Sequence, residues 1–327
     1  MPSGAPPTWQ SGAVLALLCP GQGAQKPGML TPWLADPASA DRLAAWSDAL
    51  GLDLVHLGTQ ADAETIKDTA IAQPLIVAAS LLSYLALRDE AGGHDVPVGA
   101  VVAGHSVGEL SAAAVAGVLS ADDALTLVRE RGRAMAQAAA VTPTGMSAVV
   151  GGTPESVAEA LDAAGVTAAN VNGGGQVVAA GTLDQLAALA ENPPARARVI
   201  PLAVAGAFHT GHMAPALDAV RATAATLTPA DPAPGFTLLS NRDGAAVSDG
   251  ADAVARIVAQ VANPVRWDLC CETMLELGVT GAVELCPGGV LTGLAKRTLK
   301  GVEALAITGP DDLPAARDLI TRHGGTR

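Results

Sequence analysis

Gly104-His105-Ser106-Val107-Gly108 decides the fold class, because it lies between segments of different periodicity. A run rich in β-branched residues, Val96 to Ala103, precedes it, and an Ala-rich helical segment follows it. G-x-S-x-G between a strand and a helix is typical of the nucleophile elbow, a sharp turn that exposes a serine hydroxyl at a helix N-terminus. The alternative is a turn of small residues with an idle serine, which the flanking strand and helix disfavour.

The segments on either side of this turn alternate in the same way. Ala13 to Cys19 is a short apolar run ended by Pro20-Gly21, as expected for a buried strand of a parallel sheet. Helical periodicity follows over residues 41–50 and 72–88. Strands, turns and helices that alternate along the chain predict an α/β fold.

From about Thr144 the pattern changes to βαββαβ. Extended segments at residues 146–150, 166–171, 176–180 and 198–204 are separated by two helical segments, one opened by Thr153-Pro154-Glu155 and one at 183–190. This order is that of a ferredoxin-like unit. We therefore expect a disordered lead-in at 1–12, a large α/β domain formed by 13–137 and 206–327, and an inserted small domain over 138–205. The tail after Pro310 is predicted to form a last helix.

Composition and charge exclude several classes of protein. The 327 residues are 50% apolar and 16% charged, enough to bury a sizeable core. A net charge of −13 and only 2% aromatic residues argue against nucleic-acid binding. Mean hydropathy is +0.35, but we expect no contact with a membrane, taking the uncharged apolar runs to be shorter than the roughly 18 residues that span a bilayer.

The cysteines indicate a cytoplasmic protein. None of the four forms a CxxC pair or a zinc-like spacing with histidine, and the first residues lack the features of a signal peptide. We therefore expect reduced thiols and no metal site. The cysteines are Cys19, Cys270, Cys271 and Cys286.

An acyl-transfer serine needs two backbone N–H groups directed at the oxyanion. Val107, directly after Ser106, supplies one of them. Gly21-Gln22-Gly23 follows the first predicted strand, and its glycines permit close approach of the backbone. We expect the Gln22 amide to be the second donor.

The serine also needs a base, for which histidine is the usual residue. His105 directly precedes Ser106 and should project elsewhere, in a structural role. His209 and His212, spaced i, i+3, resemble metal ligands, but no third ligand is apparent. His209, beside the apolar Phe208, is the preferred base. Three further histidines are expected to be solvated: His56, His94 and His323.

Arg131 lies on the apolar stripe of a predicted helix. Val128 and Met135 share this stripe, whereas Arg129 and Arg133 point to water. An inward arginine requires an anion. A structural carboxylate and a substrate carboxylate held by two hydrogen bonds both remain open as its partner.

Six motifs in order, from about Val14 to Lys300, together resemble the malonyl-CoA:acyl carrier protein transacylases: GQGAQ, GHSVGE, RERGRAM, GAFHT, NPVRW and ELCPGGVLTGL. The resemblance implies an α/β-hydrolase-like large domain, an inserted ferredoxin-like domain and a cleft between them. It further implies a ping-pong transfer of malonyl from malonyl-CoA to the phosphopantetheine thiol of an acyl carrier protein for fatty acid synthesis, without a cofactor.

The resemblance assigns a role to each matching position. Ser106 corresponds to the nucleophile and His209 to the general base and acid. Gln22 and Val107 correspond to the oxyanion donors. Arg131 corresponds to the partner of the malonyl carboxylate.

Further positions follow from the same resemblance. The family orients its histidine with a backbone carbonyl, which here belongs to Gln260. Phe208 and Met135 are expected to set acyl selectivity, with Phe208 filling the space of an α-methyl group. An acidic carrier protein needs cations on this acidic chain, and Lys296 with Arg297 is the expected contact, the alternative being a solvated helix end.

Three other functions compete with this interpretation. A discrete acyltransferase that loads a polyketide synthase carrier would share every catalytic residue. A serine esterase or thioesterase would share the elbow, but Arg131 and the inserted domain favour a transferase. A scaffold without chemistry is disfavoured because Ser106, His209 and Arg131 are all present.

Overall fold

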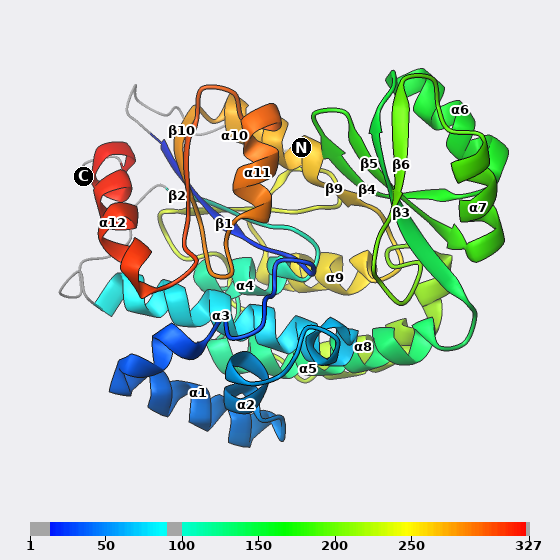
Figure 1. Cartoon of the computed structure of the whole chain (residues 1–327). Helices are drawn as coiled ribbons and strands as arrows, with labels where there is room; N and C mark the ends of the chain where they lie inside the picture. Colours follow the sequence, from blue (N-terminus) through cyan, green and yellow to red (C-terminus); the bar gives the residue numbers. More distant parts are fainter. Residues whose placement is uncertain (1–13, 90–99, 325–327) are drawn as a thin grey trace, which may run out of the picture.

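The first apolar run of the chain forms β1 (Val14–Cys19), an inner strand of a six-stranded sheet (Figure 1). The structure, a computed structural model, describes residues 14–89 and 100–324. The sheet order is β11-β10-β1-β2-β7-β8, and all neighbours are parallel except β7 and β8. The remaining strands are β2 (Ala100–Gly104), β7 (Phe236–Leu239), β8 (Ala246–Val247), β10 (Val279–Glu284) and β11 (Glu303–Ala306).

Helices cover both faces of this sheet, as expected when the strands are parallel (Figure 1). One face carries α1 (Pro37–Leu50), α2 (Leu54–Thr59), α3 (Thr69–Asp89), α4 (Gly108–Val115), α5 (Ala121–Ala139), α8 (Leu217–Ala224), α9 (Gly250–Gln260) and α12 (Leu313–His323). The other carries α10 (Trp267–Glu276) and α11 (Val290–Thr298). Successive residues of β1 alternate between the two cores: Leu15 and Leu17 face the first, Ala16 and Leu18 the second.

Short 3-10 turns and the chain ends complete this description. The turns are η1 (Thr31–Ala35), η2 (Thr65–Lys67), η3 (Gly211–Ala216) and η4 (Pro310–Asp312). The expected last helix is present as α12. The predicted lead-in at 1–12, His94 and residues 96–99 of the second predicted strand lie outside the described residues.

One helix overturns the premise of the membrane argument. Among the described residues, Thr69–Arg88 in α3 is long and apolar enough to cross a bilayer by length and composition. The expectation that no apolar run reaches that length was therefore wrong. In the structure 78% of this window is buried, with α3 packed against α4 and α5. A core helix meets the same criterion, so α3 is weak evidence for a membrane span.

A second sheet forms the smaller unit, in the order β6-β3-β5-β4-β9. Its elements are β3 (Thr144–Gly151), α6 (Pro154–Ala164), β4 (Thr167–Gly173), β5 (Gln176–Thr182), α7 (Leu183–Glu191), β6 (Ala197–Pro201) and β9 (Val265–Arg266). The predicted βαββαβ order is confirmed, and Thr153 caps α6 as its sequence indicated. The predicted fold class, α/β with a ferredoxin-like unit, is confirmed.

Two details differ from the predicted domain limits. Helix α5 continues to Ala139, past the predicted boundary at residue 138. The small sheet also gains a fifth strand, β9, whose residues Val265 and Arg266 pair with Asn170 and Val171 of β4. A strand of two residues has no periodicity that a sequence could reveal.

The small sheet has one face on helices and one face on the large domain. Val149 and other residues of one face pack against α6 and α7, which lie on the side away from the six-stranded sheet (Figure 1). The opposite face lines a cavity shared with the large domain. Its cavity-lining residues are Met146, Ala148, Asn170, Asn172, Gln176 and Val178.

Candidate active site

Ser106 lies on a sharp turn between β2 and α4, with a positive φ of 54°. The glycines on either side permit this turn. A Cβ on Gly104 would lie 2.1 Å from the backbone of Gly108, and a Cβ on Gly108 would lie 2.2 Å from the carbonyl oxygen of Cys19. The backbone N–H of Ser106 donates to Asn241 Oδ1 at 2.8 Å, which holds the turn from outside.

His209 faces the serine from the chain that returns after the small domain. Its Nε2 lies 2.7 Å from Ser106 Oγ, and its Nδ1 lies 2.8 Å from the carbonyl oxygen of Gln260. Because a carbonyl only accepts, Nδ1 carries the proton and Nε2 is free to accept from the serine. Burial, reinforced by Arg131, lowers the pKa of His209 to about 3. The imidazole is therefore neutral at pH 7, the form in which it acts as a base.

Two backbone amides lie beside this pair. Cys19 and Gly104 are partners in the parallel ladder, so the turns that follow β1 and β2 meet at the same edge of the sheet. Gln22 lies in the first turn, and its side chain donates to Thr69 Oγ1 at 3.2 Å. Within residues 14–89 and 100–324, the N–H groups of Gln22 and Val107 donate to no protein acceptor. Both amides are thus available to an oxyanion.

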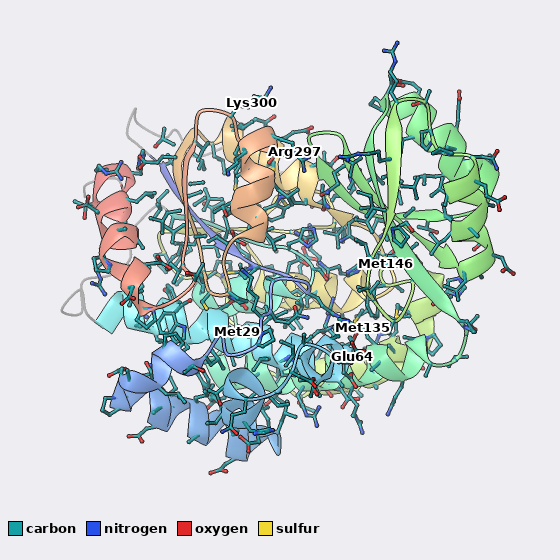
Figure 2. All side chains as sticks on the ribbon, in the orientation of Figure 1. Met29, Glu64, Met135, Met146, Arg297 and Lys300 are labelled. Carbon is teal, nitrogen blue, oxygen red and sulfur yellow. The ribbon has the colours of Figure 1, made fainter. Side chains whose placement is uncertain are left out.

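A cavity of about 380 Å³ connects these groups to the surface. Gln22, Ser106, Phe208 and His209 line it from the large domain, and the face of the small sheet described above lines it from the other side. Arg297 on α11 lines it as well, and Figure 2 labels Arg297 together with Met146 on β3. The two domains therefore share one cleft.

Arg131 lies in α5, completely buried. Its Nη1 donates to Gln73 Oε1 at 2.6 Å and its Nη2 to Gln260 Oε1 at 3.0 Å. Its Nε is buried with no hydrogen-bond partner, and within the described chain no carboxylate lies within 4.0 Å. Of the two partners left open by the sequence, a structural carboxylate in direct contact is thus excluded there. Neutral amides hold the guanidinium, and its Nε keeps a donor for a further anion. Arg131 lies behind the cleft, because it is 0% exposed and is not one of the cleft-lining residues.

Of the two residues expected to set acyl selectivity, Phe208 lines the cleft and Met135 does not. Phe208 is buried and lines the cleft beside His209. Met135 is buried behind it, where its sulfur accepts from Gln73 Nε2 at 3.5 Å, and it is not part of the cleft lining. Met135 therefore contacts Gln73, the residue that holds Arg131, and its expected part in acyl selectivity stays a prediction.

His105 lines the cleft as well, next to the nucleophile. Its Nε2 lies 2.9 Å from Asn172 Oδ1, and its ring meets that of Trp267 edge-on at 5.7 Å. Burial lowers its pKa, so it is neutral at pH 7. The structural role expected for His105 takes the form of a link between the elbow and the small sheet.

The remaining described histidines and Arg129 lie outside the cleft lining. His56 is exposed, and His323 is partnered by Glu303 and Thr280, contrary to the expectation of a solvated side chain. The expectation that Arg129 points to water was also wrong, because it is half-buried and donates to the Ala70 carbonyl at 3.3 Å. Among the described residues, no three metal-ligating side chains cluster around His212 or elsewhere.

The C-terminal motif fixes helix α11. Buried Glu284 accepts the backbone N–H groups of Gly289, Leu291 and Thr292 at 2.8–2.9 Å, which satisfies the free donors at the start of the helix. Lys296 and Arg297 occupy its last turn and are exposed. The motif thus holds a helix that lines the cleft and carries exposed cations.

Sequence reasoning did not single out four polar residues that contact the site. Gln73 holds Arg131, and Asn172 holds His105. Glu109 and Asn241 bind each other and Gln260 behind the elbow. A signal for two of them was present: Glu109 is an acidic residue in an otherwise apolar helical segment, and Asn241 follows a strand at the edge of the sheet where Ser106 lies.

The fold and the site define a class of enzyme: one that uses a serine nucleophile and a neutral histidine for acyl transfer. The model of the acyl transferase domain family matches residues 16–315. The chain is 54% identical over 308 residues to the malonyl CoA-acyl carrier protein transacylase of Mycobacterium tuberculosis H37Rv, covering 94% of this chain and all of that protein. It is 35% identical over 311 residues to the Escherichia coli K12 protein of the same name, covering 93% and 99%.

Solved structures agree with this assignment. The crystal structure of the Mycobacterium tuberculosis transacylase superposes with a TM-score of 0.88 at 54% identity, covering 92% of this chain and 99% of that one. A malonyl-transacylase solved in complex with its type II polyketide synthase acyl carrier protein superposes with a TM-score of 0.85 at 33% identity, covering 94% and 99%. The chain belongs to the acyl transferase domain family and, within it, to the malonyl CoA-acyl carrier protein transacylases.

Proposed function

We propose that this chain moves the malonyl group from malonyl-CoA to the phosphopantetheine thiol of an acyl carrier protein through an ester on Ser106. The observation that carries the proposal is the hydrogen bond between Ser106 Oγ and the neutral His209 Nε2 at 2.7 Å, in a cleft shared by both domains. The 54% identity to a named transacylase supports the choice of substrates.

The first half-reaction forms the ester. Ser106 Oγ attacks the thioester carbon while His209 Nε2 takes its proton. The oxyanion accepts from the N–H groups of Gln22 and Val107. The C–S bond then breaks, and His209 returns the proton to the sulfur of the departing CoA.

The second half-reaction reverses these steps with a new thiol. The carrier thiol gives its proton to His209 as its sulfur attacks the ester carbon. The C–O bond breaks, and Ser106 Oγ regains the proton. CoA enters and leaves as a substrate, so this chemistry needs no resident cofactor or metal.

Arg131 is the proposed partner of the malonyl carboxylate. Its unpaired Nε and its neutral ligands support this role, because the positive charge is not already balanced by a direct contact. Holding the acyl group by its far end orients the ester carbonyl for the incoming thiol. This orientation favours transfer over hydrolysis, which distinguishes the proposal from an esterase.

The cleft also offers groups to the pantetheine arm that both substrates share. Asn170 Oδ1, which belongs to the cleft-lining face of the small sheet, is buried without a hydrogen-bond partner. A secondary amide N–H of the arm supplies the donor that this oxygen lacks. Phe208, which fills space beside His209, is proposed to disfavour an α-branched acyl group.

The proposed contact for an acidic carrier is the C-terminal turn of α11. Lys296 and Arg297 are exposed there, and Figure 2 labels Arg297 on α11 and Lys300, which lies in the turn after the helix. Because the net charge of the chain is −13, docking of an acidic partner depends on such a local cationic patch. We propose a fatty acid carrier as the partner, and a cytoplasmic location consistent with four free buried cysteines.

Intact-mass spectrometry after incubation with malonyl-CoA tests the proposal directly. We expect a malonyl adduct that is absent in Ser106→Ala, present in the exposed-serine control Ser248→Ala, and discharged by a holo carrier protein. Free malonate without an adduct would indicate a hydrolase. Faster discharge by a polyketide synthase carrier than by a fatty acid carrier would reassign the partner.

A further inference from the structure

Glu109 is a buried carboxylate behind the active site, 4% exposed. It lies in the first turn of α4, three residues after Ser106. One of its oxygens, Oε1, accepts the backbone N–H of Asn241 at 2.6 Å. The other, Oε2, accepts a short hydrogen bond from Gln260 Nε2. Within the described chain no cation contacts this carboxylate directly, and its polar neighbours are these amide groups and the Ser240 side chain.

The Gln260 side chain links Glu109 to Arg131 through two hydrogen bonds. Gln260 Nε2 donates to Glu109 and also to Asn241 Oδ1 at 3.1 Å, while Gln260 Oε1 accepts from Arg131 Nη2 at 3.0 Å. Burial raises the pKa of Glu109 to about 7, and the Asn241 hydrogen bond and the charge of Arg131 oppose that rise. In its ionised form the carboxylate can only accept, so it selects the nitrogen end of the amide. Glu109 therefore turns the oxygen end of the same amide toward the guanidinium.

The same residue is linked to the base. The carbonyl oxygen of Gln260 accepts from His209 Nδ1 at 2.8 Å, at the C-terminal end of α9. A shift of Gln260 thus displaces both the arginine and the histidine. The side-chain amide has a donor end for Glu109 and an acceptor end for Arg131, which explains why a glutamine suits this position.

Asn241 forms a second connection, to the nucleophile. Its Oδ1 accepts the N–H of Ser106 at 2.8 Å, and its Nδ2 donates to the carbonyl of Gly104 at 2.8 Å. Its own N–H is the one bound by Glu109. Glu109 therefore holds Asn241, the residue that binds the Gly104 carbonyl and the Ser106 N–H within the elbow.

We propose that Glu109 is a positioning residue of the transfer reaction, which acts through Gln260 to hold Arg131 for the acyl carboxylate and through Asn241 to hold Ser106. The inference rests on the proposed function. In its ionised form Glu109 also attracts Arg131 across Gln260 without occupying its hydrogen-bonding groups, so it offsets part of the cost of burying the guanidinium while the Nε stays free for substrate.

Glu109→Gln tests this role because it preserves shape and removes the all-acceptor character. The new amide nitrogen must face either Gln260 Nε2 or the Asn241 N–H, both donors, so one contact is lost. We expect the ratio of kcat/KM for malonyl-CoA to that for acetyl-CoA to fall about tenfold or more, since hydrogen bonds to charged groups are worth that much. The overall kcat should fall as well.

Glu284→Gln is the matched control. Glu284 is equally buried and also accepts backbone amides, but it has no contact with Gln260. We expect it to lower the Tm and leave the malonyl to acetyl ratio as in the wild type. A Glu109→Gln variant that lowers both substrates by the same factor would overturn the inference, because that is the pattern of a merely structural residue.

A second variant keeps the inference testable if Glu109→Gln does not fold. Gln260→Leu removes the side-chain amide and keeps the backbone carbonyl that binds His209, so the malonyl to acetyl ratio should also fall about tenfold. An unchanged ratio would overturn the inference. If the wild-type enzyme forms no malonyl ester, the proposed function fails, whereas an ester with unchanged variant ratios rejects only the role of Glu109.

Discussion

Ser106 Oγ and His209 Nε2 lie 2.7 Å apart although the two residues are separated by 103 positions in the chain. Both have a positive φ, 54° and 62°, a conformation that costs free energy in residues with a side chain. Asn241 holds the serine turn, and the Gln260 carbonyl holds the histidine ring. Strain at both partners, maintained by neighbours, is typical of a preorganised site.

Replacement of His209 by alanine should slow both half-reactions, by about 10²- to 10⁴-fold. The same Nε2 takes the proton from Ser106 in the first step and from the carrier thiol in the second. Rapid-mixing measurements of ester formation and ester discharge separate the two steps. His212→Ala is the control, since His212 lies outside the cleft lining. A defect limited to discharge would place His209 in carrier docking.

The buried imidazole should also make stability depend on pH. The pKa of His209 is lowered to about 3, whereas an unfolded histidine binds its proton below about 6.5. Between these values the unfolded chain holds a proton here that the native state does not, so the free energy of unfolding falls as pH falls. Urea denaturation at pH 7 and pH 5 should show a smaller fall for His209→Gln than for the wild type. Equal falls would show that His209 is protonated in the folded protein.

Removal of the Arg131 side chain should change the acyl preference. Arg131→Ala leaves the malonyl carboxylate without its cation, so malonyl transfer should fall at least tenfold relative to acetyl transfer. Competition between malonyl-CoA and acetyl-CoA, read by intact mass, measures this ratio. Arg133→Ala, at an exposed position paired with Glu130, should leave it unchanged. An unaltered ratio in Arg131→Ala would indicate a structural cation.

Charge reversal on α11 should weaken the reaction with the carrier protein and leave the reaction with malonyl-CoA unchanged. Lys296→Glu is expected to raise the KM for the carrier protein several-fold at low salt and less at high salt, because screening weakens such contacts. Ester formation from malonyl-CoA should stay as it is. Arg297 is less selective as a test because it also lines the cleft. Arg221→Glu on α8 is the control, and an equal effect there would exclude a specific patch.

The elbow glycines should be intolerant of a methyl group. In Gly108→Ala the new Cβ would meet the Cys19 carbonyl oxygen at 2.2 Å, so we expect a loss of about 1–3 kcal/mol in the free energy of unfolding. Gly293→Ala in α11 places its Cβ in open space and should stabilise the helix by up to about 1 kcal/mol. Thermal unfolding of both variants provides the measurement. A Gly108→Ala variant as stable as the wild type would contradict the packing argument.

The periodic and local features could be predicted from sequence because neighbouring residues determine them. Apolar runs gave β1 and the βαββαβ order, and the glycines around Ser106 indicated the elbow. The length of α3, which is enough to span a bilayer, was missed from sequence. An apolar helix in a protein core and one in a bilayer can have the same length and composition, so only the packing of α3 distinguishes them. The strand β9 was missed because its two residues pair only with a distant partner.

The sequence by itself determined which residue types are present and where turns, strands and helices begin, because backbone preferences and hydrophobic periodicity act over a few residues. It therefore indicated Ser106 and Arg131 as unusual positions. Only the tertiary structure decided that Gln73 and Gln260, and no carboxylate, contact Arg131 in the described chain. Only folding also places Glu109 within reach of Gln260, 151 positions away. Hydrogen bonds between buried groups depend on how distant elements pack, and local sequence carries no record of that packing.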